Sequence, residues 1–220
     1  MWGPDAQPES SKRLGWLDLA SESRALVEPL AKLREELVAE GLDHIVLAGM
    51  GGSSLAPEVI TETVGKSLVT LDTTDAGQVR AALAENLDRT ILVVSSKSGG
   101  TVETDSHRRA YVKAFVDAGL SEADANKRLV VVTDPGSPLE KSAKEAGVRA
   151  VFLANPNVGG RYSALTPLSA WCPARWPAST FPSCWTRPKP YAARWLIQTA
   201  RRSRSVLPLA PRTKPVATRS

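Results

Sequence analysis

Short apolar runs alternate with amphipathic segments along most of the chain. Apolar residues at helical spacing between Leu26 and Val38 predict a helix over residues 21–40, and Gly41 follows it as a stop. Pro29 is compatible with this helix only near its first turns, because proline has no N–H to donate. Five apolar runs predict buried strands at residues 43–48, 67–71, 90–94, 129–133 and 149–153.

Helical patterns separate these strands. They predict helices at residues 55–64, 75–86, 101–118 and 137–146. Strands that alternate with helices form right-handed βαβ crossovers, which give a parallel sheet with helices on both faces. The sequence therefore predicts an α/β fold, a three-layer αβα sandwich with a five-stranded parallel sheet.

The segment of residues 95–104, Ser-Ser-Lys-Ser-Gly-Gly-Thr-Val-Glu-Thr, joins a predicted strand to a predicted helix. Hydroxyls at Ser96, Ser98 and Thr101 can donate hydrogen bonds to a phosphate. The glycines let backbone N–H groups approach it, and the helix N-terminus carries partial positive charge. In the alternative interpretation the segment is an ordinary loop in which Thr101 only caps the helix, with Glu103 near the reciprocal capping position.

A second glycine-rich loop, Gly-Met-Gly-Gly-Ser-Ser at residues 49–54, also joins a strand to a helix. Its spacing is neither that of a dinucleotide fingerprint nor that of a P-loop. The glycines could serve tight packing of the helix on the strand alone. However, parallel sheets bind ligands outside the carboxyl ends of their strands, and both polar loops are expected on that rim. Together they favour a phosphate site over either loop's structural alternative.

A third loop carries an arginine. In Val-Gly-Gly-Arg-Tyr-Ser, residues 158–163, the two glycines allow a turn that could direct Arg161 at the same rim. A guanidinium there would bind or stabilise an anionic oxygen. The alternative is a surface arginine that follows a turn.

Charge is distributed unevenly along the 220 residues, so the net charge of +5 misleads. Residues 1–166 hold 18 Lys and Arg against 23 Asp and Glu, whereas residues 167–220 hold 10 Lys and Arg and no acid. Four of the six tryptophans and nine of the sixteen prolines also follow residue 166. The basic balance of the whole chain is therefore no argument for a nucleic-acid partner.

Nothing in the sequence indicates export, a membrane or a metal. No run approaches the roughly 20 apolar residues that a membrane span needs, and the start of the chain lacks a signal-peptide core. Cys172 and Cys184 are the only cysteines, and His44 and His107 are too few and too separated for a metal cluster. We expect a cytoplasmic protein that binds no metal.

Taken together, the three loops resemble the glucose-6-phosphate isomerase family, in an actinobacterial-looking form. The resemblance covers roughly residues 2–166. The family has two sugar-isomerase (SIS) domains, and this chain resembles the first. By this resemblance Arg161 would stabilise the cis-enediolate intermediate. The residues implied in binding the substrate's phosphate are Gly52, Ser53, Ser96, Lys97, Ser98 and Thr101.

The resemblance implies an aldose–ketose isomerase that interconverts glucose 6-phosphate and fructose 6-phosphate without a cofactor, in a homodimer. The reaction moves a proton between C1 and C2, so it needs a general base. In the family a glutamate is the base, and a histidine and a lysine assist ring opening. All three belong to a later half of the family's sequence that we do not find here, so we expect little or no turnover. The alternative is a stand-alone SIS module that binds a sugar phosphate without catalysis.

The basic segment of residues 167–220 has the composition of a GC-rich gene read out of frame. Shifting the reading frame from Leu168, with GC-rich codons where the genetic code leaves a choice, permits F-G-L-V-P-G-A-L-A-G-V-D-V-P-E-L-L-D, which looks like a helix start and like the family's continuation. We therefore expect a lead-in at residues 1–20, an incomplete first SIS domain at 21–166 and a frameshifted, largely disordered tail at 167–220. The alternative is a natural basic, aromatic arm for nucleic acid, with Arg201 and Arg202 among its charges.

Overall fold

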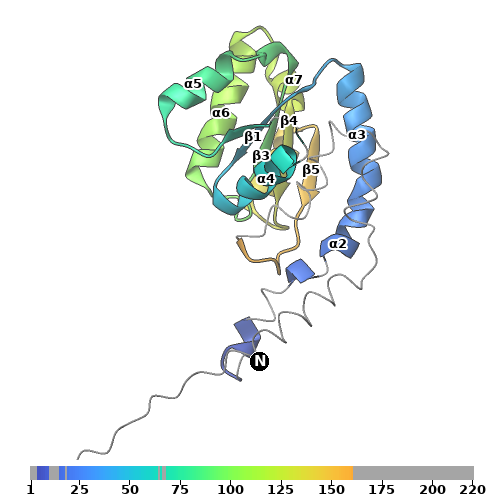
Figure 1. Cartoon of the computed structure of the whole chain (residues 1–220). Helices are drawn as coiled ribbons and strands as arrows, with labels where there is room; N and C mark the ends of the chain where they lie inside the picture. Colours follow the sequence, from blue (N-terminus) through green and yellow to red (C-terminus); the bar gives the residue numbers. More distant parts are fainter. Residues whose placement is uncertain (1–3, 10–14, 18, 64, 66–67, 161–220) are drawn as a thin grey trace, which may run out of the picture. The chain divides into compact units, whose positions relative to one another are not determined.

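One parallel sheet forms the centre of the fold (Figure 1). The computed structural model describes residues 4–9, 15–17, 19–63, 65 and 68–160. The described strands, β1 (His44–Gly49), β2 (Val69–Leu71), β3 (Thr90–Ser95), β4 (Leu129–Thr133) and β5 (Ala150–Leu153), lie in the order β2-β1-β3-β4-β5. All four pairings are parallel, which confirms the predicted α/β fold with a five-stranded parallel sheet.

Helices cover both faces of this sheet. They are α2 (Leu19–Glu22), α3 (Val27–Ala39), α4 (Leu55–Thr63), α5 (Ala76–Ala84), α6 (Val102–Asp117), α7 (Glu122–Lys127) and α8 (Pro138–Ala146), with 3-10 turns at Gly15–Leu17, Ser23–Leu26, Gly51–Ser53 and Leu87–Arg89. Residues of α5, α6, α7 and α8 share one core cluster, whereas α3 and α4 lie on the other side of the sheet (Figure 1). Right-handed crossovers explain why the helices divide between the two faces. The connection from β1 to β2 runs toward one edge of the sheet, whereas the connections from β2 to β3, β3 to β4 and β4 to β5 run toward the other edge, so their helices lie on the opposite face.

Two local features differ from the predicted elements. The helix predicted at residues 21–40 is divided, and a 3-10 turn at Ser23–Leu26 precedes α3. Pro29 has no N–H and restricts the residue before it, so the regular helix begins only where Pro29 falls in its first turn. The apolar pattern also missed the short helix α7. Its signal was the N-cap Ser121, whose side chain accepts a hydrogen bond from the amide of Asp124.

The core lies between the central strands and α6. Every residue of β3 and β4 is buried, as expected for strands with helices on both faces. On α6, Tyr111 and Phe115 are 0% and 1% exposed, and their ring centroids lie 5.9 Å apart. This pair anchors α6 and therefore the loop that precedes it. None of the described helices combines the length and apolar character needed to cross a bilayer.

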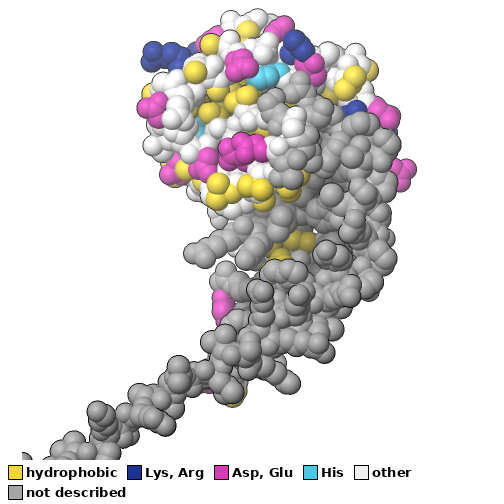
Figure 2. Space-filling view, in the orientation of Figure 1, with side chains coloured by type: hydrophobic (Ala, Val, Ile, Leu, Met, Phe, Trp, Pro, Cys, Tyr) yellow, Lys and Arg dark blue, Asp and Glu magenta, His cyan; other side chains and the backbone are white. Residues whose placement is uncertain are grey.

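Helix α4 exposes part of its apolar surface. Leu55 and Val59 lie one turn apart and are 57% and 60% exposed. In Figure 2 a row of hydrophobic side chains runs beside acidic side chains where α4 lies in Figure 1. Pro57 and Thr61 are the buried residues of this helix, so α4 turns only a narrow stripe toward the interior.

An ion pair joins the end of α3 to the start of β5. The guanidinium of Arg149 donates to both carboxylate oxygens of Glu40, at 2.8 and 2.5 Å, and its Nε donates to the carbonyl of Lys127 at 2.8 Å. This hydrogen bonding by Arg149 lowers the pKa of Glu40. A carboxyl whose pKa is lowered by folding stabilises the fold above its ordinary pKa, and that contribution is lost as the pH falls through the lowered value.

Replacing Glu40 by Gln is therefore expected to have a small, pH-dependent effect. Near neutral pH the free energy of unfolding should fall by less than about 1 kcal/mol, as for other exposed pairs. At about pH 3 the variant and the wild type should differ less in stability than near neutral pH, because the carboxyl becomes protonated in the folded chain as the pH falls through its lowered pKa. Urea unfolding at both pH values measures this. Glu35→Gln, an exposed position on the same helix, is the control. An equal loss at both pH values would contradict the prediction.

Candidate functional site

The two polar loops meet at the carboxyl edge of the sheet. Strands β1 and β3 are neighbours, and their last residues, Gly49 and Ser95, are paired in register. From β1 the chain crosses to β2 at one edge, whereas from β3 it continues to β4 on the other side. The position between β1 and β3 is therefore the topological switch point, where parallel α/β sheets bind their ligands. The prediction that both loops share one rim is confirmed.

The loop after β3 is organised by its own hydroxyls. Ser96 is 3% exposed, and its Oγ lies 2.9 Å from Oγ1 of Thr101. The amide of Gly99 donates to the carbonyl oxygen and to the Oγ of Ser96, at 3.2 and 3.1 Å. The amide of Gly100 donates to Oγ of Ser98 at 3.3 Å. The three hydroxyls predicted to bind phosphate thus belong to one compact turn.

Thr101 stands at the N-cap position of α6 but does not cap the helix with its side chain. Its hydroxyl bonds to Ser96 instead. The first N–H groups of a helix have no intrahelical partner, and a capping side chain usually satisfies one of them. Among the residues that the structure describes, no side chain does so at α6, which leaves these amides and the positive end of the helix dipole available to an anion.

Two backbone carbonyls of the loop are bound to β4 and its end. The carbonyl of Ser96 accepts from Oγ1 of Thr133 at 2.7 Å, and that of Lys97 accepts from the amide of Asp134 at 3.2 Å. In a trans peptide the N–H points opposite to the C=O, so the amides of Lys97 and Ser98 point away from β4. Within the described part of the chain, neither amide donates a hydrogen bond. At these two peptides the loop therefore presents donors rather than acceptors to a ligand.

The side chain of Lys97 spans neighbouring strand ends. Its ammonium lies 2.5 Å from Oδ2 of Asp134 and donates to the carbonyl of Pro156 at 3.2 Å. The pair is mostly buried, with side-chain exposures of 23% and 19%. Lys97 thus joins the loop after β3 to the segments after β4 and β5. Its role in binding phosphate stays a prediction.

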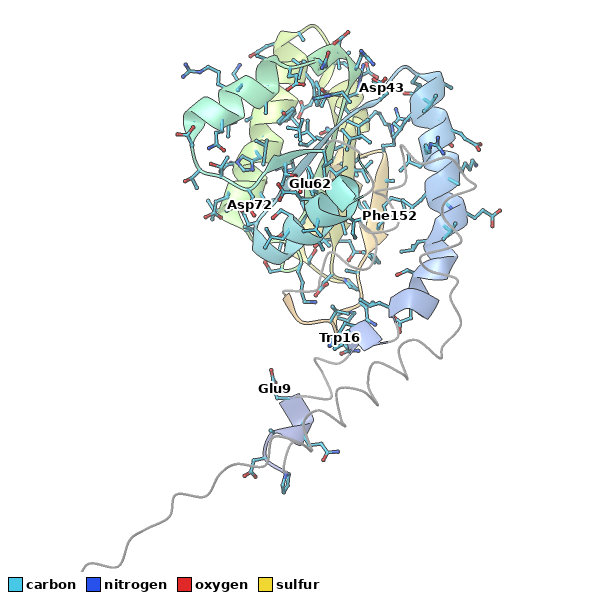
Figure 3. The ribbon with its side chains drawn as sticks, viewed as in Figure 1. Glu9, Trp16, Asp43, Glu62, Asp72 and Phe152 are labelled. Atoms are coloured by element: carbon cyan, nitrogen blue, oxygen red, sulfur yellow. The ribbon has the colours of Figure 1, made fainter. Side chains whose placement is uncertain are left out.

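The loop after β1 approaches β3 closely. A Cβ on Gly49 would lie 3.1 Å from Cβ of Ser53 and 3.2 Å from the carbonyl oxygen of Ser95, which explains the glycine there. Asp72, just after β2, lies beside this loop (Figure 3). Its Oδ2 accepts from the amide of Gly51 at 3.0 Å and from the hydroxyl of Ser54. Gly49 therefore has the packing role that the sequence offered as an alternative, because it lets the loop after β1 lie close to the end of β3 at the switch point.

Sequence reasoning did not select Asp72, Thr133 or Asp134, although all three stand at strand ends. Their position could have identified them as candidate site residues, because they stand at or just after the ends of apolar runs, as the predicted ligands do. Of the predicted ligands, Ser53 is buried, while Gly52 is half-buried in the 3-10 turn Gly51–Ser53. Arg161 and the segment of residues 167–220 lie outside the described residues, so their predictions stay predictions.

A cavity of about 280 Å³ adjoins the loop between α6 and α8. Arg108 and Arg109 line it and share one carboxylate, that of Asp105, at 2.7 and 2.6 Å. Burial by itself raises the pKa of Asp105, but the hydrogen bonds and charges of the two arginines outweigh burial and lower it. The cluster carries one net positive charge beside the loop. Among the described residues, no group of His, Cys, Asp and Glu could hold a metal ion.

Solved structures of sugar-phosphate isomerases share this fold. Tagatose-6-phosphate ketose/aldose isomerase from Escherichia coli shares the fold, with a TM-score of 0.50 at 18% identity, covering 89% of this chain and 51% of that one. A glucose-6-phosphate isomerase from Chlamydia trachomatis superposes with a TM-score of 0.59 at 29% identity, over 67% of this chain and 29% of that one.

The sequence profile of phosphoglucose isomerase matches residues 35–170, and the chain belongs to that family. A glucose-6-phosphate isomerase of Thermus thermophilus is 34% identical over 165 residues, which cover 73% of this chain and 38% of that protein. The enzyme of Cyanothece sp. is 35% identical over 130 residues, which cover 56% of this chain and 24% of that protein. The chain thus spans less than two fifths of the length of these relatives.

Proposed function

We propose that this chain is the phosphate-binding part of a glucose-6-phosphate isomerase, which interconverts glucose 6-phosphate and fructose 6-phosphate. One observation carries the proposal. The carbonyls of Ser96 and Lys97 are bound toward β4, whereas among the described residues the amides of Lys97 and Ser98 and the first turn of α6 have no partners and lie beside three hydroxyls. Such an array of donors at a helix N-terminus suits a phosphate group.

In this proposal the phosphate lies against the turn after β3. Ser96, Ser98 and Thr101 donate from their hydroxyls, and the free amides donate from the backbone. The loop after β1 adds Gly52 and Ser53 from the neighbouring strand end. The pairing of Gly49 with Ser95, the last residues of β1 and β3, supports this, because both loops then start at the same level of the sheet. Lys97 contributes positive charge from its position against Asp134. Hydrogen bonds to a charged group are stronger than those between neutral groups, so each donor adds measurably to the affinity for the phosphate.

The chemistry we propose is proton transfer between C1 and C2 through a cis-enediolate, with no cofactor. The guanidinium of Arg161 would stabilise the enediolate oxygen. The base glutamate and the histidine and lysine that assist ring opening come from the family's later half, so we expect this chain alone to bind sugar phosphate with little turnover. We place the parent enzyme in the cytoplasm as a homodimer, as the family resemblance implies.

Isothermal titration with fructose 6-phosphate tests the proposal. The wild-type chain is expected to bind in the micromolar range. Ser96→Ala is expected to weaken binding by about tenfold or more, since a hydrogen bond to a charged group contributes about 1.5–3 kcal/mol. Ser106→Ala is the matched control, because its hydroxyl donates to the carbonyl of Val102 within α6. Wild-type chain that shows no binding at millimolar ligand would refute the proposal.

A coupled assay for glucose 6-phosphate formation measures turnover in the same samples. Turnover at rates typical of enzymes, from about 1 to 10³ s⁻¹, would show that this chain supplies its own base and would contradict that part of the proposal.

We further propose that residues 21–166 are the family's first SIS domain and that residues 167–220 are read in a shifted frame. The absence of acids after residue 166 and the end of the profile match at residue 170 support this. Resequencing the gene across the codons for residues 166–168 tests it. An inserted or missing base that reopens the family's sequence is the expected result, and an intact frame would refute it.

A further inference from the structure

Thr133, the last residue of β4, has no place in the phosphate site proposed so far. It is completely buried. Its Oγ1 lies 2.7 Å from the carbonyl oxygen of Ser96 and 2.7 Å from Oγ of Ser137, with a longer contact of 3.5 Å to the carbonyl of Lys97. Oγ of Ser137 in turn accepts from the amide of Glu140 at 3.1 Å, in the first turn of α8. A chain of hydrogen bonds thus leads from α8 to the loop after β3.

The direction of every proton in this chain follows from the groups themselves. A carbonyl oxygen has no proton, so Thr133 must donate its only hydroxyl proton to Ser96. Its oxygen must then accept from the hydroxyl of Ser137. The oxygen of Ser137 is free to accept the amide proton of Glu140, as observed. All three bonds run one way, from the N-terminus of α8 toward the carbonyl of Ser96, and aligned hydrogen bonds strengthen one another.

This chain determines how the Ser96–Lys97 peptide is oriented. The strand ladder of β3 ends at Ser95, and the bond from the amide of Ser96 to the carbonyl of Val132 is the last one from the sheet. Beyond it, the carbonyl of Ser96 accepts from the amide of Gly99 within the loop and from Thr133, and the bond from Thr133 is the one that holds this carbonyl toward β4 and the amide of Lys97 the opposite way. If that peptide rotated, a carbonyl oxygen would replace an N–H donor, and a phosphate oxygen would be repelled.

We propose that Thr133, supported by Ser137, is a positioning residue for phosphate binding. It keeps the backbone donors of the loop pointed at the ligand without touching the ligand itself. The inference rests on the proposed function, since it assumes that the loop of residues 96–101 binds the phosphate of a sugar phosphate. A binding site whose donors are held in place by surrounding hydrogen bonds loses less entropy when the ligand binds.

Titration with fructose 6-phosphate of four forms of the chain tests the proposal. Thr133→Val removes the hydroxyl and keeps the shape, and it is expected to weaken binding by about tenfold, as loss of a supporting shell commonly does. Thr133→Ser restores the hydroxyl and should bind within about twofold of the wild type. The control is Thr90→Val. Thr90 is also completely buried, and its hydroxyl also donates to a backbone carbonyl, that of Asn86, at 2.7 Å, but at the amino end of β3.

Thermal unfolding of the same proteins separates positioning from a general loss of stability. Thr133→Val and Thr90→Val should lower the unfolding temperature by similar amounts, because each leaves a buried carbonyl without its hydroxyl partner. Only Thr133→Val should weaken the binding of fructose 6-phosphate. If Thr133→Val does not fold, Ser137→Ala replaces it, with an expected weakening of about threefold.

Failure of this inference and failure of the proposed function give different results. Wild-type binding that Thr133→Val retains would overturn the positioning role alone. Equal weakening by Thr133→Val and Thr90→Val would do the same. No binding by the wild type would overturn the proposed function and the positioning role together.

Discussion

Replacing Gly99 by Ala is expected to weaken the binding of fructose 6-phosphate by about hundredfold or more, the scale at which a misplaced binding group acts. Gly99 has φ of +69°, and an added Cβ would lie 2.8 Å from Cβ of Ser137 and 2.9 Å from the backbone nitrogen of Leu139. A left-handed conformation costs a residue with a Cβ about 1–2 kcal/mol. The contact with Leu139 is worse, because a backbone atom at the start of α8 cannot move aside as a flexible side chain can.

The loop must therefore shift away from α8, and Ser96 shifts with it. The amide of Gly99 donates to both oxygens of Ser96 that can accept, so the displacement reaches the hydroxyl and the carbonyl together. Binding should fail even in molecules that remain folded, because the donors no longer converge on one point.

Gly100→Ala is the matched control for this prediction. A Cβ at Gly100 meets nothing within 4 Å, and its φ is not in the left-handed range. Titration of both variants with fructose 6-phosphate, together with their thermal unfolding, measures the effect. Binding by Gly100→Ala should stay within about threefold of the wild type, as for a change that creates no contact. If both substitutions weakened binding equally, the close approach to α8 would not be the cause.

Phe115→Ala is expected to have the largest effect on stability, lowering the free energy of unfolding by about 3–5 kcal/mol. The side chain is 1% exposed and packs in the core cluster with Tyr111 and with residues of the central strands. Removing the ring leaves a cavity beneath the last turn of α6, and the surrounding groups can relax only partly because the residues of β3 are buried. Since α6 carries the helix end of the proposed site, binding should weaken as the folded fraction falls.

Val116→Ala is the control, one residue further along the same helix and 41% exposed. Its cost should stay below about 1 kcal/mol, as for most exposed positions. Urea unfolding near neutral pH, followed by circular dichroism, compares the three proteins. A loss at Phe115 no greater than that at Val116 would show that α6 is not held by this core.

Much of the architecture could be predicted because it depends on residues close together in the chain. The apolar run of β3 is buried on both faces and stood out from its surroundings, as did the helical spacing of α6. Parallel strands end at one rim, so the two polar loops could be expected together. Element boundaries were harder to predict where local rules compete. Pro29 fits a helix only in its first turn, so α3 begins later than the apolar spacing predicts. Helix α7 has a capping serine but little apolar periodicity, so it was missed.

For the candidate site, the sequence suggested a set of ligands, which stays a prediction, but not the contacts that hold them. Ser96, Ser98 and Thr101 lie within six residues, so their type and spacing pointed to a phosphate. Their supports are distant in the chain. Thr133 lies 37 residues from Ser96, and Asp134 lies 37 residues from Lys97.

Residue type and spacing were enough to indicate the class of fold and the rim on which the loops lie, and the resemblance of three motifs to a known family indicated the family. The order β2-β1-β3-β4-β5, the partner of Lys97 and the direction of the Ser96–Lys97 peptide depended on how the strands pair in space. The physical reason is that hydrogen bonds act over about 3 Å, whatever the separation along the chain. Local pattern can therefore suggest a phosphate-binding loop, but only the packed sheet determines where its backbone donors point.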